Sequence, residues 1–431
     1  MNQDALDWLF SLAQFGIKFG LDNIRAIVES LGHPERQYRS VHIAGTNGKG
    51  SVAAIVELAL RSAGHRTGRY TSPHLLDLSE RFAIDGRPVE RDLLIEAVTT
   101  VREAVDHLRA HGRLDVHPTF FEVTTAAGFE IFRRSAVDIA VCEVGLGGRL
   151  DATNVLSPMV CGITSIAFDH EQYLGHTLAA IAVEKAGIIK PRTPVVVGRV
   201  PQEAGDAIRD AASSLNAPLI KAMDGVDVGP VAVLPDGSQR FTLRTPRRTY
   251  GEVHLALAGD HQVDNAVVAV RLIEQLESTG TATGQNAIVT ALATVRWPGR
   301  LERIVLPDGR EALLDAAHNA AGATALAHHL ERLREGRPLV FSAMRDKDAA
   351  TMLAVLAPFV SRLIVTRASN PRAADPSALA SIVAHVAPEL PVEIEESPAD
   401  ALARAWSAGP RIVVAGSIFL LADAMKQLGR S

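Results

Sequence analysis

The chain has 431 residues, of which 47% are hydrophobic and 22% are charged, as in ordinary soluble globular proteins. Its length predicts two or three domains, and its net charge of −5 argues against a general nucleic-acid or anionic-membrane surface. The first residues are acidic rather than basic, and no apolar run is long enough to span a membrane, so we expect a cytoplasmic protein. Cys142 and Cys161 lie in apolar strand-like runs, so we expect both thiols to be buried.

The first segment predicts a helical cover on a sheet edge. Apolar residues repeat at helical spacing over residues 3–32, with an interruption at Phe19-Gly20-Leu21-Asp22. Asp22 is in position to cap the second of the two helices. Residues 90–111 show the same spacing and predict another amphipathic helix.

A glycine-rich turn, Gly45-Thr46-Asn47-Gly48-Lys49-Gly50-Ser51, joins a short apolar strand to a helical pattern. Strand, turn and helix in this order form a phosphate cradle, because backbone N–H groups and the helix N-terminus point into the turn. We expect Lys49 to be the only cation in this cradle and to neutralise phosphate charge. An ordinary glycine-rich turn is the alternative, but the flanking strand and helix favour phosphate.

The turn departs from the standard nucleotide loop at two positions. Ile43 stands where that loop has glycine, and the hydroxyl expected directly after Lys49 is displaced by one residue, to Ser51. The sequence therefore predicts a variant of the loop rather than the common form.

Two further stretches combine a structural and a functional interpretation. Ser72 follows a short strand and could ligate a metal, although its spacing alone favours a turn-capping hydroxyl. Thr119 stands three residues before Glu122, which predicts a capping box at the start of a helix that runs to about Arg134. That box explains both residues structurally.

Acidic residues end two predicted parallel strands. Residues 137–145 form an apolar run that holds Glu143, and residues 160–166 form another that is followed by Asp169-His170-Glu171. A charge in an apolar run is costly unless a cation partners it, so we favour a metal ligand over a salt bridge for Glu143. A histidine beside acids is commonly a surface residue. Together with Glu143, His170 could complete a magnesium or manganese site with phosphate oxygens.

Lys185 lies in a helix predicted over residues 177–187, among Ala and Ile residues. The plain interpretation is a helix lysine whose charged end reaches solvent. A strand is predicted over 194–200 and a helix over 202–215. Short alternating strands over about 218–258 predict an accessory antiparallel patch, and a helix follows from Gly259 to about Leu276.

The fold class that follows is α/β. Residues 1–296 predict a P-loop-type, mainly parallel ATPase domain, and residues 297–431 predict a second, smaller Rossmann-like α/β domain. Proline and glycine in residues 296–300 mark the hinge. Strand and helix patterns then alternate over 311–316, 319–334, 338–343, 348–360, 362–367, 376–386, 392–396, 398–408, 411–416 and 418–428. Asp315-Ala316-Ala317-His318-Asn319 falls at the end of the first of these strands, where ligand sites gather.

The loop Gly-Thr-Asn-Gly-Lys-Gly-Ser resembles that of the bifunctional dihydrofolate synthase and folylpolyglutamate synthase family, relatives of the Mur ligases. Further motifs resemble the family's in the same order and span most of the chain. They are residues 71–75, 119–122, 143 with 147–154, 169–170, 184–188, 261–265, 297–300, 315–319 and 416–417. Any one of them is weak, but the ordered set is specific.

The resemblance implies site residues for each part of the reaction. The catalytic residues are Lys49, Lys185 and His318. The ATP contacts are Gly45, Thr46, Asn47, Gly48, Lys49, Gly50, Ser51, Asn265, Arg300 and Asp315. The pterin or folate contacts are Gly20, Leu21, Thr119, Phe121, Glu122, Leu150, Asp151 and Ala152. One Mg²⁺ would be held by Ser72, Glu143 and His170, and a second by Lys185, which matches a lysine that the family carbamylates.

The reaction implied is ATP-dependent ligation of L-glutamate to a pteroate or folate carboxylate through an acyl phosphate. The implied partners are ATP, L-glutamate, dihydropteroate or a reduced folate and two Mg²⁺ ions, with a monovalent cation as a further candidate. We expect a monomer that binds neither nucleic acid nor membrane.

Three alternatives stay open at this point. The enzyme could extend folates only, or it could be a Mur-type ligase that adds an amino acid to a UDP-sugar peptide. A nucleotide-binding regulator without ligation is the third. We favour an enzyme that uses both pteroate and folates, because the pocket motifs near 20, 119–122 and 150–152 are all present.

Overall fold

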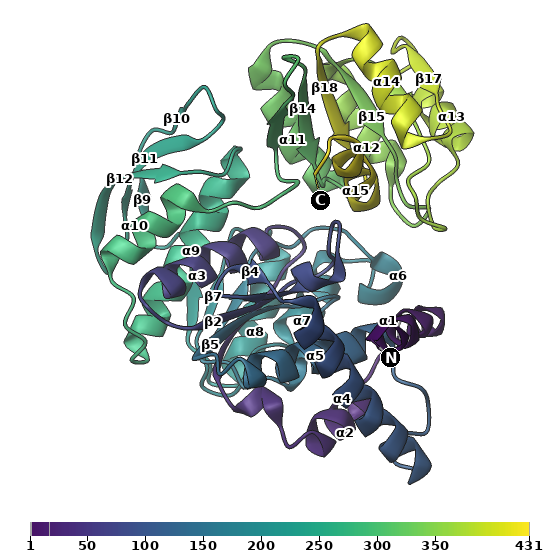
Figure 1. Cartoon of the computed structure of the whole chain (residues 1–431). Helices are drawn as coiled ribbons and strands as arrows, with labels where there is room; N and C mark the ends of the chain where they lie inside the picture. The colour runs from purple at the N-terminus through teal and green to yellow at the C-terminus, as the bar shows by residue number, and fades with distance from the viewer. Residues whose placement is uncertain (1, 17, 431) are drawn as a thin grey trace.

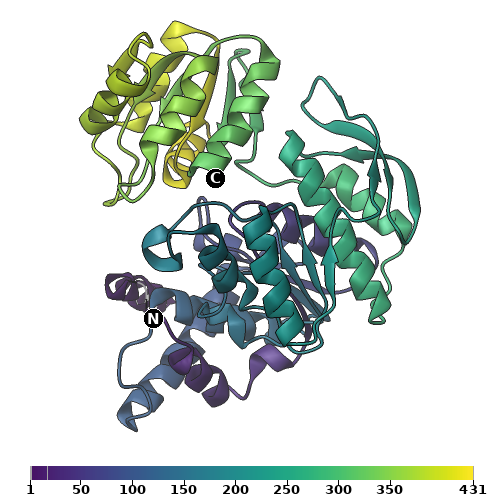
Figure 2. The same cartoon turned by 180° about the vertical axis from the view of Figure 1, so that it is seen from behind.

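The computed structural model describes residues 2–16 and 18–430. The chain folds into a larger α/β body, formed by the purple to teal part of the ribbon, and a smaller α/β body, formed by its green to yellow end (Figures 1 and 2). The predicted fold class, a P-loop-type body with a smaller Rossmann-like one, is confirmed. Position 17, within the predicted helical segment 3–32, lies outside the described residues.

The larger body is built on one sheet. Among the described residues this sheet has eight strands in the order β4-β3-β2-β5-β1-β6-β7-β8. The six strands from β2 to β8 run parallel, while β3 and β4 form an antiparallel hairpin at one edge. Parallel strands buried on both faces read as apolar runs, which is why the sequence identifies β1, β5, β6 and β7. The strands are β1 Arg39–Ala44, β2 Thr67–Tyr70, β3 Phe82–Ile84, β4 Arg87–Pro88, β5 Ile139–Glu143, β6 Val160–Ile163, β7 Val195–Val197 and β8 Leu219–Lys221.

Helices cover both faces of this sheet. Val41 and Ile43 of β1 face a core formed with α3, α9 and α10, and the opposite face packs on α4, α5, α7 and α8. The helices are α1 Asn2–Ser11, α2 Asp22–Ser30, α3 Lys49–Ser62, α4 Arg91–Ala110, α5 Phe120–Arg134, α6 Glu171–Leu174, α7 Leu178–Ala186, α8 Gln202–Ser214, α9 Asp260–Ser278 and α10 Gln285–Thr294. Cys142 and Cys161 are buried free thiols, as predicted.

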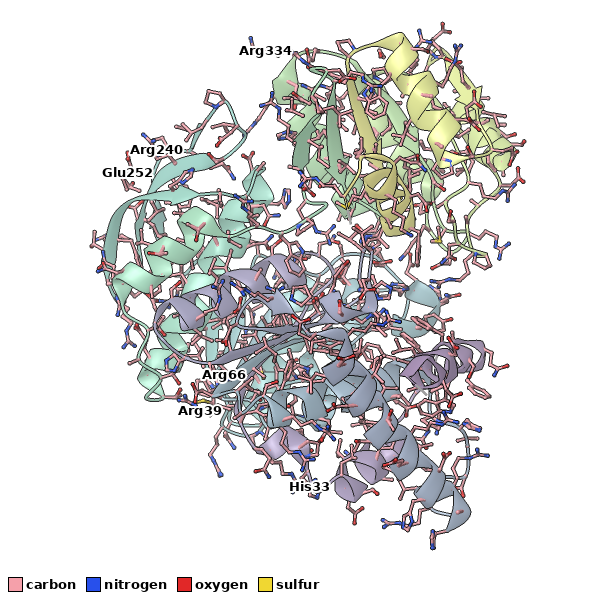
Figure 3. The ribbon with its side chains drawn as sticks, in the orientation of Figure 1. His33, Arg39, Arg66, Arg240, Glu252 and Arg334 are labelled. Carbon is pink, nitrogen blue, oxygen red and sulfur yellow. The ribbon has the colours of Figure 1, made fainter. Side chains whose placement is uncertain are left out.

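Within residues 18–430, four short strands form the accessory antiparallel sheet beside α10. They are β9 Asp227–Val228, β10 Ala232–Val233, β11 Gln239–Arg244 and β12 Thr249–Leu255. Inward residues alternate with outward ones, so Arg240 and Glu252 are exposed and pair at 3.7 Å (Figure 3). The predicted range of about 218–258 is too wide, because residues 219–221 are β8 and pair in parallel with β7.

The smaller body contains a second open sheet, with helices on both faces. In the part of the chain that the structure describes, its six strands run in the order β13-β14-β18-β15-β16-β17, and all but β13 are parallel. The elements are β13 Glu302–Val305, β14 Glu311–Asp315, α11 Ala320–Leu333, β15 Arg337–Phe341, α12 Ala349–Leu356, β16 Val360–Val365, α13 Pro376–Val386, β17 Val392–Ile394, α14 Pro398–Ala408, β18 Arg411–Ala415 and α15 Ile418–Gln427.

Two local predictions are wrong. Asp22 is the first residue of α2 and makes no side-chain capping bond, because Leu21 occupies the cap position. β14 is not the first strand of its sheet, since β13 precedes it and pairs with it in antiparallel fashion. The sequence patterns also do not predict α10 or the β3–β4 hairpin.

No helix in the described residues is both long and apolar enough to cross a membrane.

Candidate active site

The glycine-rich turn lies in the middle of the larger sheet. It connects β1, which pairs with β5 and β6, to the first turn of α3. Gly48 caps α3 with a φ of 86°, a conformation that favours glycine, and its α-carbon faces the Asn265 side chain from α9. Two residues directly after β6 hold the turn in place: the hydroxyls of Thr164 and Ser165 donate to the Asn47 carbonyl at 2.6 and 3.1 Å. It is therefore a preformed cradle.

Gly50 explains why the loop departs from the common form. A β-carbon at this position would approach the Trp297 ring to 2.5 Å, so a hydroxyl-bearing residue does not fit directly after Lys49. The displaced hydroxyl of Ser51 is buried and has no hydrogen-bond partner among the described residues. A buried polar atom without a partner is costly, so Ser51 Oγ is available to a phosphate or to a metal that accompanies it.

Two lysines, not one, converge on the turn. Lys49 Nζ donates to the carbonyls of Gly45 and Thr46 at 3.0 and 3.2 Å, and Lys185 Nζ donates to the same Gly45 carbonyl at 3.1 Å. The prediction that Lys49 is the only cation in the cradle is therefore wrong. Burial, with a smaller contribution from Lys49, lowers the pKa of Lys185 to about 7. The interpretation of Lys185 as a solvent-directed lysine is also wrong, because its side chain is buried.

Glu143 ends β5 beside the cradle, as its place in the sequence predicts. Its Oε1 lies 3.8 Å from Lys49 Nζ, and the Ser72 N–H donates to its carboxylate. Burial raises the pKa of Glu143, with Lys49 and Arg300 opposing that shift. A divalent cation would satisfy the same buried carboxylate.

The donor set fits Mg²⁺ held partly by phosphate oxygens. Across residues 2–16 and 18–430, no group of three or more His, Cys, Asp or Glu side chains forms a ready-made metal site. Magnesium commonly takes one or two carboxylates together with substrate phosphates. Glu143, Ser72 and the free hydroxyl of Ser51 offer that kind of site.

His170 contacts a different set of residues from the one predicted. It faces Asp169 and Lys347, with Lys347 Nζ 3.3 Å from its Nε2, rather than joining Ser72 and Glu143 in a compact cluster. Burial lowers its pKa to about 4, so the ring is neutral and able to ligate a metal. Its Nδ1 is buried and unpartnered within the described part of the chain.

Residues of the smaller body meet the larger one at Asp169. Lys347 forms an ion pair with the Asp169 carboxylate, and His318 Nε2 lies 3.6 Å from it. Burial opposes the effect, but contact with His318 and the positive charge of Lys347 lower the pKa of Asp169, which stays ionised. The amides of Asn47 and Asn319 exchange two hydrogen bonds of 3.1 Å. His318 therefore reaches the cleft from the second body, as expected.

A cavity of about 220 Å³ adjoins the turn on the α9 side. Six of the residues expected to contact ATP line it, and they come from both bodies: Asn47, Gly48, Ser51, Asn265, Arg300 and Asp315. Asp315 also has a structural role, because it accepts the N–H groups of Leu301 and Ala317 at 2.8 and 2.9 Å. The arrangement suits a nucleotide that bridges the two bodies.

Several of the expected pterin residues come together on the face of the larger sheet that packs on α4 and α5. Leu21, Ala152 and Phe121 belong to one apolar cluster, which also brings the start of α2 close to residues 152–155. Phe121 packs against Gly145 and lies 6.3 Å from Tyr70 between ring centroids. The predicted capping box is confirmed: Thr119 and Glu122 exchange hydrogen bonds of 2.7 to 3.2 Å. Glu122 Oε1 is nevertheless buried without a partner among the described residues, which leaves an acceptor for a ring N–H.

Asp151 holds the loop that borders this pocket. Its carboxylate accepts the Thr153 N–H at 3.0 Å, the Leu146 N–H at 2.8 Å and the Thr153 hydroxyl. Burial raises its pKa, and these bonds oppose the shift. A direct bond from Asp151 to a pterin would compete with these donors, so the geometry favours a role in holding the loop around Gly145.

Asp151→Ala is expected to raise KM for the pteroate or folate acceptor roughly tenfold, because the unpaired loop N–H groups would disorder that pocket. KM for ATP should change less than about twofold, since the nucleotide cavity uses other residues. Steady-state titrations of each substrate measure both values. Asp375→Ala is the control, because Asp375 in the smaller body likewise accepts a backbone N–H two residues further on, that of Ser377 at the start of α13. Equal effects of Asp151→Ala on both KM values would contradict a role at the acceptor pocket.

Glu143→Ala and His170→Ala are each expected to raise the Mg²⁺ concentration for half-maximal activity roughly tenfold, as the loss of a metal-binding group does. Activity is titrated with Mg²⁺ at saturating ATP. Glu171→Ala is the control, because this exposed acid next to His170 lies outside the predicted donor set. If both variants titrate like the parent protein, the two residues are structural.

Several residues of the cleft were not singled out from sequence. Thr164 and Ser165 are polar residues directly after a buried strand, a signal that could have identified them. Lys347 gave no such signal. Lys347 lies in the charged run Arg345-Asp346-Lys347-Asp348, which resembles a solvated loop.

Two family models match the chain. The Mur ligase middle domain matches residues 97–273, and the Mur ligase glutamate ligase domain matches residues 299–418. The curated dihydrofolate synthase/folylpolyglutamate synthase of Bacillus subtilis is 36% identical over 356 residues, which cover 81% of each chain.

Solved structures match over nearly the whole chain. Folylpolyglutamate synthase of Mycobacterium tuberculosis, complexed with ADP and AMPPCP, has a TM-score of 0.92 and 35% identity, with 100% of each chain covered. Escherichia coli FolC in complex with DHPP and ADP has a TM-score of 0.86 and 28% identity, with 99% of this chain and 97% of that chain covered.

Proposed function

Because this chain belongs to the dihydrofolate synthase and folylpolyglutamate synthase family of the Mur ligases, we propose that it joins L-glutamate both to dihydropteroate and to reduced folates at the expense of ATP. One observation carries the proposal. The larger body combines a phosphate cradle with two lysines, Glu143 at 3.8 Å from Lys49, and an aromatic pocket in which Glu122 Oε1 has no partner among the described residues.

The cradle provides for phosphoryl transfer. The N–H groups of the turn and Lys49 hold the phosphates of ATP, and the acceptor carboxylate attacks the terminal phosphoryl group to give ADP and an acyl phosphate. Glu143, Ser72 and Ser51 would hold Mg²⁺, which neutralises phosphate charge when bound. His170 would join them by exchanging its contact with Lys347 for the metal. Lys185, as a carbamate, would hold a second ion. A monovalent cation remains a further candidate.

The smaller body provides for the second step. The amine of L-glutamate attacks the acyl carbon, the bond between that carbon and the phosphate oxygen breaks, and inorganic phosphate leaves. His318 Nδ1 donates to the Ala316 carbonyl at 2.8 Å, which orients Nε2 toward Asp169 and the cleft. At that nitrogen His318 would take the proton that the glutamate nitrogen loses as the amide bond forms. Contacts between the bodies, such as the Asn47–Asn319 pair, would exclude water from the acyl phosphate.

The proposal includes the boundary between the bodies at residues 296–297. It is supported by the position of Trp297-Pro298-Gly299-Arg300 between α10 and β13 and by the start of the glutamate ligase match at residue 299. It also treats the protein as a cytoplasmic monomer whose partners are small molecules. A Mur-type reaction on a UDP-sugar peptide would leave the pocket around Phe121 unexplained.

Glutamate-dependent ADP release, measured first with dihydropteroate and then with tetrahydrofolate, tests the acceptor range. We expect turnover with both, and a mass gain of one glutamyl residue in each product. Turnover with tetrahydrofolate alone would restrict the enzyme to folate extension. Turnover with neither acceptor would overturn the proposed function, and ATP hydrolysis without glutamate would favour a regulator.

A further inference from the structure

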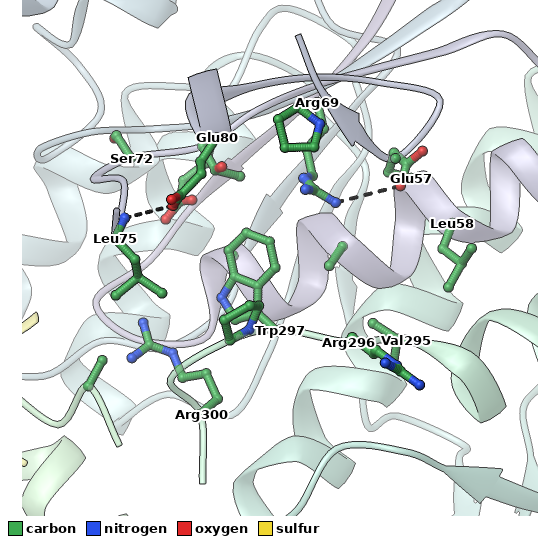
Figure 4. Close-up of a pocket in the computed structure, with 18 of the residues that line it drawn as sticks. Glu57, Leu58, Arg69, Ser72, Leu75, Glu80, Val295, Arg296, Trp297 and Arg300 are labelled. Atoms are coloured by element: carbon green, nitrogen blue, oxygen red, sulfur yellow. Dashed lines mark hydrogen bonds and ion pairs between the residues drawn. The ribbon is translucent and has the colours of Figure 1, made fainter. Parts of the chain in front are cut away.

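A second cavity, of about 580 Å³, opens beside the cradle on the outer side of α3 (Figure 4). Its walls come from α3, the loop after β2, the linker at residues 294–300 and the first residue of α15, so both bodies contribute to it. Gly50, Ser72 and Glu143 line it as well, which places one end of the cavity at the reaction centre. Its size is that of a small-molecule site. Of its wall residues, Arg300 and Ala316 also line the nucleotide cavity, while the remainder belong to neither that cavity nor the apolar cluster around Phe121.

The walls of this cavity hold four arginines: Arg61, Arg69, Arg296 and Arg300. The acids near them are already engaged. Glu57 is buried and accepts the Thr67 hydroxyl at 2.6 Å and Arg61 Nε at 3.2 Å, and it lies 3.6 Å from Arg69.

Glu80, the other wall carboxylate away from the reaction centre, is engaged in the same way. It accepts the backbone N–H groups of Leu75, Leu76 and Asp77, each at 2.8 Å. Arg296 and Arg300 have no acidic partner within ion-pair distance among the described residues. The cavity therefore carries surplus positive charge.

Arg69 shows where an anion would bind. Its guanidinium lies 5.0 Å from the centre of the Trp297 ring and points into the region between Trp297 and Glu57 (Figure 4). Arg69 Nε is buried and has no acceptor within residues 2–16 and 18–430. A buried N–H group on a charged side chain is costly when unpaired, so an oxygen from a ligand would complete it.

We propose that this cavity holds the glutamyl residues that precede the reacting carboxylate in acceptors that already carry more than one glutamate. The inference rests on the proposed function. A γ-linked tail has one free α-carboxylate per residue, which matches the arginines, and methylene groups that would pack on Trp297, Leu58 and Leu75. Its terminal carboxylate has to reach Lys49 and Glu143, and this cavity opens at that point.

The double variant Arg61→Gln and Arg296→Gln tests the inference. Both side chains lie at the outer part of the cavity, outside the predicted catalytic and nucleotide sets, and Glu57 keeps Arg69 as its partner. For a triglutamyl folate we expect KM to rise about fivefold, because the variant loses two partly exposed charge contacts with the tail. For the shortest acceptor that the parent protein uses, KM should stay within about twofold. Arg109→Gln, an exposed arginine on α4, is the matched control.

Binding of a free γ-linked tetraglutamate, which lacks any pterin, separates this inference from the proposed function. Calorimetry needs no turnover. We expect the peptide to bind the parent protein in a salt-sensitive way and the double variant about fivefold more weakly. Equal peptide binding by both proteins, or an equal rise of KM for short and long acceptors, would overturn the inference while ligation persists. Absence of ligation with every acceptor would instead overturn the proposed function.

Discussion

Replacing Lys49 with alanine is expected to lower the rate of ATP-dependent ligation at least about 100-fold, the scale of losing one charge-stabilising donor in an enclosed site. Lys49 Nζ lies within 3.0 to 3.2 Å of the carbonyls of Gly45 and Thr46 and 3.8 Å from Glu143, so it is held at the position where transferred charge develops. Lys185 stays near the turn in this variant, but it does not replace a cation at the Lys49 position.

The fold is expected to survive the loss of Lys49. Burial already raises the pKa of Glu143, so that carboxyl group can take up a proton when its cation is removed. Circular dichroism and thermal unfolding of the variant check this point. Lys221→Ala, which changes an exposed lysine on β8, is the control for activity. An unchanged kcat/KM in Lys49→Ala would remove the basis for the phosphate assignment.

The Lys185→Ala variant is expected to lose at least about 100-fold in the rate of ligation. Short carboxylic acids at high concentration should restore part of that rate. The lysine amine would add to the carbon of CO₂ and lose a proton, which gives an anionic carbamate that can ligate a metal. Only the neutral amine reacts, and burial with the nearby Lys49 charge lowers the pKa of Lys185 to about 7. A neutral amine is therefore well populated near neutral pH.

The matched control for rescue is Lys49→Ala. The group lost at position 49 is a cation, so carboxylic acids should not restore that variant. Rescue of both variants to the same extent would show a general effect of the added acid. Electron density for an unmodified Lys185 amine in a crystal with nucleotide and magnesium would contradict the carbamate.

Much of the site could be predicted because its residues follow strands. Glu143 ends an apolar strand of the larger sheet and Asp315 ends one of the smaller sheet, and ligand sites gather at such carboxyl ends of parallel strands. The glycine-rich turn was recognisable for the same reason. The capping box at Thr119 and Glu122 was readable as a local pattern, because both partners lie within one helical turn.

The remainder depends on contacts that local sequence does not encode. Gly50 is required by Trp297, which is 247 positions away in the chain, and Lys347 reaches Asp169 across the cleft between the two bodies. Lys185 reads as a surface helix residue until the fold buries it against the Gly45 carbonyl. The sequence does not predict β13, because only Ile304 of its four residues is buried and the strand therefore gives no apolar run.

The central claim is that the acceptor carboxylate takes the terminal phosphoryl group of ATP at the Lys49 cradle. Dihydropteroate labelled with a heavy oxygen isotope in its carboxylate tests this directly, by mass analysis of the phosphate released during glutamate-dependent turnover. An acyl phosphate predicts one labelled oxygen in each phosphate formed and a dihydrofolate product that has lost it. Turnover that releases only unlabelled phosphate would contradict the account.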